Sequence, residues 1–337
     1  MQVLKKNKFA IGTSSLGLHP THLLDQKLHA AAKHGFTGVE IVYQDLSTYS
    51  THHSLPILTA AQHIHTLCTT LNLTILSLCP FENYEGALSP LSSRLALAST
   101  WLTIARALQT PHIQVPAQFA QETSSTPLST IVSDLQALAD LAASESPAIR
   151  IAYEPMSWSV HHSTWESLIP LLTAVDRPNF GVCIDTFHLA SKLWGNPRDA
   201  VTGKYPGADE ALRDSLERFV RDFPLEKLFY IQLSDGERFE DVYSKSHPWY
   251  VEGEAMEFSW SRHGRPFPGE SELGAYFPME EMVRALVVEK GFEGWVSFET
   301  FDRRMRGEGV GVEKCAERAE RSLRWLDGEL AGAKEKL

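Results

Sequence analysis

The sequence predicts an α/β protein, a (β/α)8 barrel that occupies residues 1–337 as a single domain. Eight short apolar stretches are each followed by a helical pattern or a long connection, and the composition does not change along the chain. The alternative is a doubly wound open sheet, which usually has fewer strands and a glycine-rich phosphate turn after the first. The turn at 12–17 does not match the G-x-G-x-x-G pattern of that turn, so the barrel is favoured.

The expected elements follow one another in order. Continuous apolar runs, typical of strands buried on both faces, cover 8–12, 38–42, 73–78, 112–115, 150–154, 182–185, 228–232 and 294–300. Helical spacing covers 23–34, 55–71, a segment through Ala96, Trp101, Ala105 and Leu108, then 128–143, 164–174, 208–221, 279–290 and 313–330. Residues 43–53 are expected to form a polar loop, and 186–207 a long irregular one.

A second long loop is expected after the seventh strand, at about 234–278, where no clear periodicity is visible. Connections in compact domains are usually about 4–6 residues long, so a loop of this length is usually functional or disordered. Its aromatic residues and arginines favour a functional loop. Closure of this loop over a substrate is a hypothesis.

Composition excludes several classes of protein. The formal net charge of −11 at pH 7 opposes attraction to nucleic acid and to anionic membranes. There is no apolar run long enough for a membrane helix and no signal-peptide pattern at residues 1–8, so a soluble, cytoplasmic protein is expected. The cysteines form no CxxC pair, which predicts buried free thiols at Cys68, Cys79, Cys183 and Cys315. The sequence does not indicate an oligomeric state.

Oxygen-bearing side chains end four consecutive expected strands, the fifth to the eighth. They are Glu154, Asp185, Gln232 and Glu299. The carboxyl ends of parallel strands lie on one face of a barrel, so these side chains are expected to converge there as the ligands of one metal ion. Oxygen ligands favour Mg²⁺ or Mn²⁺, although Co²⁺ or Zn²⁺ could compete. Each acid alone could instead be a helix N-cap or a rim ion-pair residue.

Further candidates lie close to these ligands in the sequence. His188 follows Asp185 by three residues, and a titratable imidazole at the same barrel mouth suits proton transfer. Three carboxylates and one divalent ion leave a negative charge, so an anionic substrate would need cationic partners. Arg262 and Arg265, framed by prolines and glycines, are the expected clamp. His161 is a weaker candidate for substrate binding.

Four segments carry a resemblance to a known family. They are Pro80-Phe81-Glu82-Asn83-Tyr84-Glu85-Gly86, Tyr153-Glu154-Pro155-Met156-Ser157-Trp158, Ile184-Asp185-Thr186-Phe187-His188 and Arg265-Pro266-Phe267-Pro268-Gly269. With these segments the chain resembles the xylose-isomerase-like TIM barrels of the sugar phosphate isomerase and epimerase superfamily, and more closely the fungal 3-dehydroshikimate dehydratases of quinate catabolism. The likeness covers nearly the whole chain.

The resemblance implies a hydro-lyase that converts 3-dehydroshikimate, a small anionic substrate, to protocatechuate and water. Glu154 or His188 would remove the C4 proton, the metal would stabilise the enediolate, and His188 or a bound water would assist loss of the C5 hydroxyl. Bacterial members often have Gln and Arg where this chain has Cys79 and Glu82. Arg262 or Arg265 is therefore expected to replace the cation that the third loop lacks.

Two other functions remain open at this point. A sugar or inositol isomerase or epimerase would use the same four ligands on a neutral polyol and would not need the arginines. A non-catalytic barrel would bind a metabolite without consuming it. An endonuclease-like barrel is disfavoured by the net charge and by Gln232, where a zinc cluster would favour histidine.

Overall fold

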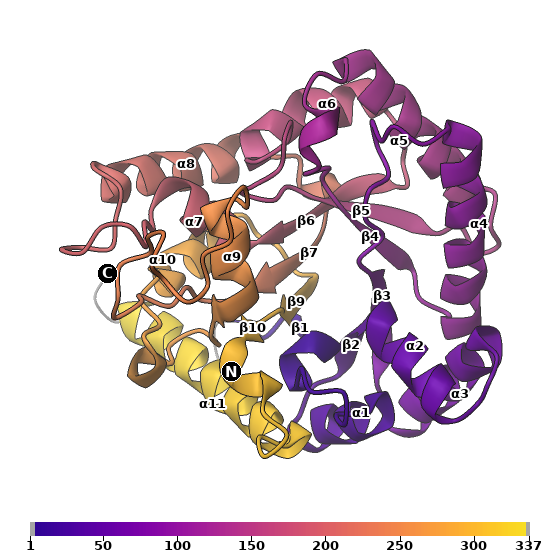
Figure 1. Ribbon diagram of the computed structural model, residues 1–337, viewed down its shortest axis with the longest axis horizontal. Helices are drawn as coiled ribbons and strands as arrows, with labels where there is room; N and C mark the ends of the chain where they lie inside the picture. The colour runs from indigo at the N-terminus through magenta and orange to yellow at the C-terminus, as the bar shows by residue number, and fades with distance from the viewer. Residues whose placement is uncertain (1–3, 335–337) are drawn as a thin grey trace.

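Eight parallel strands close into a barrel in the computed structural model, which describes residues 4–334. Each strand pairs with its neighbours along the chain, and the last pairs with the first (Figure 1). In order, the strands are β1 (Lys8–Gly12), β2 (Gly38–Val42), β3 (Thr74–Cys79), β4 (His112–Pro116), β5 (Arg150–Glu154), β6 (Phe180–Asp185), β7 (Leu228–Leu233) and β9 (Trp295–Phe298). The predicted (β/α)8 fold is confirmed.

Helices surround the barrel, and the main core lies between them and the strands (Figure 1). They are α1 (Leu24–Lys33), α2 (Tyr43–His52), α3 (Ile57–Thr70), α4 (Leu91–Leu108), α5 (Leu128–Ala143), α6 (Leu168–Val175), α7 (Thr186–Leu193), α8 (Ala208–Asp222), α10 (Met279–Val283) and α11 (Val312–Lys334). A π-helical segment, Arg284–Glu289, continues α10. A smaller cluster inside the barrel comprises Ala10, Leu76, Ala152, Cys183 and Tyr230. All four cysteines are buried and free, as predicted.

The prediction of a polar loop at 43–53 is wrong, because helix α2 occupies nearly all of this segment. Leu46 and Ser50 are its buried residues, so the apolar stripe is too thin to recognise as a helical pattern. Tyr43 and Tyr49 add partly buried rings at helical spacing and pack against the main core. Tertiary packing of these rings therefore supports a helix in a polar sequence.

The prediction of an irregular loop after β6 is also wrong for the first part of that segment, because α7 begins directly at the end of the strand. Asp185 is the N-cap of α7, and its Oδ1 accepts a hydrogen bond from the backbone N–H of Phe187 at 2.8 Å. Asp185 therefore acts as a helix N-cap, which was the alternative to a metal ligand for each of these acids. Helix α7 places His188 in its first turn.

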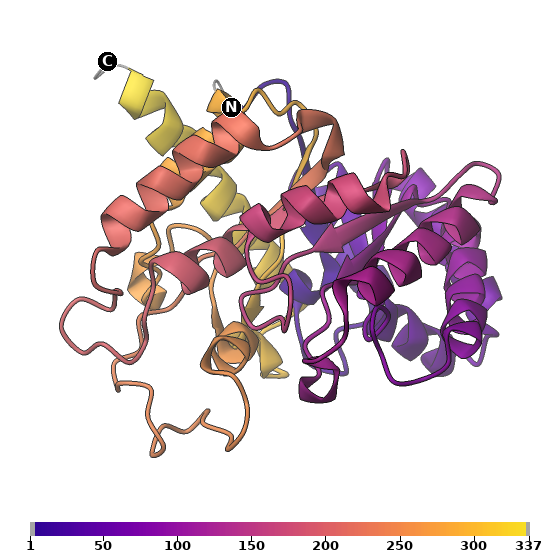
Figure 2. The ribbon, with the colours of Figure 1, turned by 90° about the horizontal axis from the view of Figure 1, so that it is seen from above.

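The long segment after β7 contains ordered structure that periodicity did not reveal. It holds α9 (Met256–His263) and β8 (Gly264–Arg265), and β8 pairs antiparallel with β10 (Phe301–Asp302). The connection that precedes α9 projects from one end of the barrel body (Figure 2). Asp235 holds this region together, because it accepts backbone N–H groups of Tyr276 and Phe277 at 3.0 and 2.8 Å.

Candidate active site

Consecutive strands bring the four predicted ligands to the carboxyl end of the barrel. Glu154 and Asp185 are the last residues of β5 and β6, and Asp185 lies beside Gln232 in the β6–β7 register. Glu299 directly follows β9. All four side chains are buried, with at most 9% of the residue exposed. Their convergence follows from the parallel strands.

The acids differ in their neighbours. Glu154, Asp185 and His188 each offer a ligand atom, and these atoms lie within 4.8 Å of one another. Glu299 Oε1 accepts a hydrogen bond from Gln232 Nε2 at 3.1 Å. Oε1 of Glu154 is buried and has no hydrogen-bond partner among the described residues. An unpaired buried carboxylate oxygen is costly, so this atom is suited to a cation or to a proton.

Arg265 is the cation that the structure places among these acids. Its Nη2 forms ion pairs with Asp185 Oδ2 and, at 3.2 Å, with Glu299 Oε2. Its Nε donates to Ser234 Oγ at 3.0 Å and its Nη1 to Ser261 Oγ at 3.3 Å. All three guanidinium nitrogens make contacts, so Arg265 is held in place by the acids and serines around it.

Burial and mutual repulsion make the charged forms of these acids unfavourable. Burial, followed by repulsion from Glu299 and Asp185, raises the pKa of Glu154 well above its ordinary value. Burial raises the pKa of Glu299 to about 8 although Arg265 opposes this, and it also raises the pKa of Asp185. One guanidinium does not neutralise three carboxylates, so the donor set fits a divalent cation.

Gln232 fits such an ion with one adjustment. Its Nε2 donates to both oxygens of Glu40 at 3.1 Å as well as to Glu299, and its Oε1 lies 3.1 Å from Cys183 Sγ. A half-turn of the amide exchanges oxygen and nitrogen and would bring Oε1 to the side of Glu299. Gln232 therefore remains a predicted ligand.

His188 lies close to Glu154 and Asp185 but forms no hydrogen bond with either of them. Its Nε2 is 3.5 Å from Glu154 Oε1 and 3.8 Å from Asp185 Oδ2, beyond the usual 2.7–3.2 Å of an N–H···O bond. Its Nδ1 accepts the backbone N–H of Ser157 at 3.2 Å. Nδ1 accepts that N–H and so carries no proton, and burial, followed by the charge of Arg265, lowers the pKa of His188 well below its ordinary value; both favour a neutral imidazole.

Sequence reasoning missed two buried residues beside the ligands. Glu40 in β2 is fully buried, contacts Gln232 and accepts a hydrogen bond from Ser77 Oγ at 2.8 Å. Gln114 in β4 donates to Glu154 Oε2 at 2.5 Å. A polar side chain in the middle of an otherwise apolar strand was the available signal for both.

The predicted substrate-binding residues lie in different surroundings. Arg265 is buried among the predicted ligands, whereas the side chain of Arg262 is half exposed and pairs with Glu254 at 3.3 Å. His161 is partly buried, and its Nε2 lies 3.1 Å from the carbonyl oxygen of Thr123. Their contacts with substrate remain predictions.

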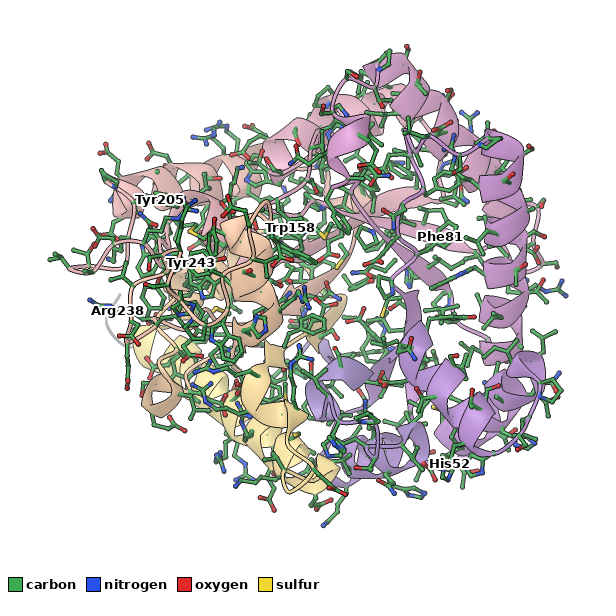
Figure 3. The ribbon with its side chains drawn as sticks, in the orientation of Figure 1. His52, Phe81, Trp158, Tyr205, Arg238 and Tyr243 are labelled. Atoms are coloured by element: carbon green, nitrogen blue, oxygen red, sulfur yellow. The ribbon has the colours of Figure 1, made fainter. Side chains whose placement is uncertain are left out.

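Trp158, in the loop that follows β5, contacts His188 and connects it to a small cluster of aromatic rings. The ring centroid of Trp158 lies 4.6 Å from that of His188 and 5.2 Å from that of Phe258 in α9. Figure 3 shows Trp158 beside α9. Phe258 also contacts Phe119, at 5.7 Å between centroids. The segment after β7 therefore reaches the site through the contact of Phe258 with Trp158.

A closed barrel of eight parallel strands with clustered acids at their carboxyl ends defines the class, and comparison with known families agrees. The chain belongs to the xylose isomerase-like TIM barrel family, whose model matches residues 28–328. It is 39% identical over 322 residues to a Neurospora crassa protein named 3-dehydroshikimate dehydratase, covering 91% of this chain and 89% of that protein. The predicted resemblance is confirmed.

Two more relatives are longer than this chain. A Pseudomonas aeruginosa protein named 3-dehydroshikimate dehydratase is 30% identical over 283 residues, which cover 83% of this chain and 36% of that protein. A solved fusion protein of a xylose isomerase-like TIM barrel with 4-hydroxyphenylpyruvate dioxygenase has a TM-score of 0.75 and 25% identity. That match covers 98% of this chain and 44% of the fusion protein.

Proposed function

We propose that this protein is a hydro-lyase, a 3-dehydroshikimate dehydratase that forms protocatechuate and water and requires one divalent cation. The observation that carries the proposal is a buried cluster of acids with a neutral histidine, in a chain 39% identical to a protein of that name. None of the described helices is long and apolar enough to span a membrane. A cytoplasmic location remains an expectation.

Glu154, Asp185, Gln232 and Glu299 would hold the cation, with Mg²⁺ or Mn²⁺ preferred because the donors are oxygen atoms. When bound, such an ion polarises a ketone and makes the adjacent C–H more acidic. Arg265 supports the two ligands that it contacts, because it fixes Asp185 and Glu299 and offsets part of their charge. The side chain of Gln114 fixes one oxygen of Glu154 and leaves the other free.

Glu154 is the proposed base. Its Oε1 has no hydrogen-bond partner in the described part of the chain and is available to accept the proton from C4 of the substrate, while Oε2, which Gln114 fixes, would be the atom that binds the cation. His188 is the proposed hydrogen-bond donor to the leaving C5 hydroxyl. Its Nε2 lies 3.5 Å from Oε1 of Glu154, so a substrate at Glu154 is also beside His188.

The bonds balance without a co-reactant. The C4–H and C5–O bonds break, a C4=C5 double bond forms, and the hydroxyl leaves as water with the proton that Glu154 took from C4, while Nε2–H of His188 donates a hydrogen bond to the departing oxygen. A further proton then moves from C6 to the ketone oxygen, which completes the aromatic ring. Aromatisation makes the overall reaction irreversible.

To test this function, purified protein is mixed with Mg²⁺ or Mn²⁺ and 3-dehydroshikimate, and the ultraviolet absorbance of the aromatic product is recorded over time. We expect protocatechuate to form, and chelation of the metal to stop its formation. Binding without consumption would contradict an enzymatic function. Turnover of neutral ketoses or inosose without turnover of 3-dehydroshikimate would instead favour an isomerase or epimerase.

A further inference from the structure

His188 is held at its Nδ1 atom by the loop that follows β5. The backbone N–H of Ser157 donates to Nδ1 at 3.2 Å, and Ser157 Oγ lies 3.4 Å from the same atom. A backbone N–H can only donate. The Nδ1 atom must therefore carry a lone pair rather than a proton.

A second serine continues this contact. Ser191 lies one helical turn after His188 in α7, and its Oγ donates to Ser157 Oγ at 2.9 Å. Because the Ser157 oxygen already accepts from Ser191, its own hydroxyl hydrogen is available for Nδ1. Ser157, Ser191 and His188 are at most 4% exposed, so water competes little with these bonds.

The other imidazole nitrogen faces the acids. In the neutral tautomer that Ser157 imposes, Nε2 carries the proton and is directed at Glu154 Oε1 and Asp185 Oδ2, at 3.5 and 3.8 Å. Both separations exceed a hydrogen bond. The Nε2–H group is thus oriented but remains free for an oxygen atom of a bound ligand.

We infer that Ser157 and Ser191 are positioning residues that hold His188 as the Nε2–H tautomer, so that His188 acts as a hydrogen-bond donor and the base is Glu154 rather than His188. This inference rests on the proposed dehydratase function for its catalytic meaning. The tautomer itself is a property of the protein and is measurable without substrate. The tautomer decides which of Glu154 and His188 is the base and which is the donor, a choice that the sequence left open.

The direct test is nitrogen NMR of the protein with ¹⁵N-labelled histidine side chains, both metal-free and loaded with Mg²⁺. The His188 signals are those that disappear in His188→Gln. We expect an Nδ1 signal typical of an unprotonated nitrogen and an Nε2 signal coupled to one proton. A protonated Nδ1 would overturn the inference, whether or not the protein dehydrates 3-dehydroshikimate.

Kinetics of serine variants test the positioning. Ser157→Ala keeps the backbone N–H that donates to Nδ1, so the tautomer should persist while the hydroxyl contact that orients the ring is lost. Ser157→Ala and Ser191→Ala should each lower kcat about tenfold, roughly the effect of one lost hydrogen bond, with KM changed less than twofold. Ser157→Thr, which keeps the hydroxyl, should recover most of kcat. Ser159→Ala is the matched control, because Ser159 lies in the same loop and bonds Ala117 and Met156 rather than His188.

Equal losses in Ser159→Ala and Ser157→Ala, or no recovery in Ser157→Thr, would contradict positioning. If no variant and no wild-type protein forms protocatechuate, the proposed function fails, and the NMR result still decides the tautomer.

Discussion

Nε2 of His188 lies 3.5 Å from Oε1 of Glu154, with no hydrogen bond between them. A reacting carbon with its departing oxygen could approach both atoms, one as acceptor of a proton and the other as donor. The pair thus combines a carboxylate whose pKa is raised with an imidazole whose pKa is lowered. Burial is the largest cause of both shifts, so the roles proposed for the two residues rest on the positions of these atoms.

Glu154→Gln should therefore lower kcat/KM at least about 1000-fold, or about 4 kcal/mol, because it removes both the base and a negative ligand. Steady-state formation of protocatechuate measures this. Glu210→Gln, at an exposed position of α8, is the control and should leave kcat/KM unchanged. Activity of Glu154→Gln within tenfold of wild type would exclude Glu154 as the base.

Arg265→Ala should destabilise the metal-free protein by about 3 kcal/mol, because it leaves buried Asp185 and Glu299 without their cation. Mn²⁺ should recover part of the loss by neutralising the same acids. Denaturant unfolding with and without Mn²⁺ measures both effects. Arg262→Ala is the control and should cost under about 0.5 kcal/mol, because its ion pair is half exposed. Similar losses in the two variants would contradict the assigned environments.

His112 should make stability sensitive to acid. Burial lowers its pKa from 6.5 to about 4, so between these values the unfolded chain binds a proton that the folded protein refuses. Stability is then present above about pH 6.5 and is lost as pH falls toward 4, by about 3 kcal/mol. His112→Asn should flatten this part of the unfolding free energy against pH. His52→Asn, at an exposed position, should leave the slope unchanged. The account of His112 fails if the two variants have the same slope.

Phe258→Ala should raise KM for substrate about 3- to 10-fold, because an aromatic contact of α9 with Trp158 and Phe119 is lost at the site. Limited proteolysis within 234–278 should become faster in this variant. Addition of substrate or product should slow cleavage in the wild type if the segment closes over the site. Unchanged cleavage in both comparisons would count against closure.

The barrel and the convergence of the four predicted ligands were predictable because strand ends are local features. Asp185 was recognisable as an acid that terminates an apolar run, and parallel strands then bring such residues to one face. Glu40 was missed because it lies within β2, so a pattern of acids at strand ends does not include it, although a single acid in an apolar strand was a signal of its role. The position of Arg265 depends on the folding of a long segment, since it meets an acid 80 residues away. Local sequence patterns do not predict a contact between residues so far apart in the chain.

The most direct measurement titrates metal-stripped protein with Mn²⁺ while recording bound metal and protocatechuate formation together. We predict one tightly bound ion per chain, turnover that rises in proportion to that ion, and loss of both in Glu299→Gln. Undiminished turnover by the stripped protein, or by Glu299→Gln, would contradict the claim that these buried acids hold the ion on which the reaction depends.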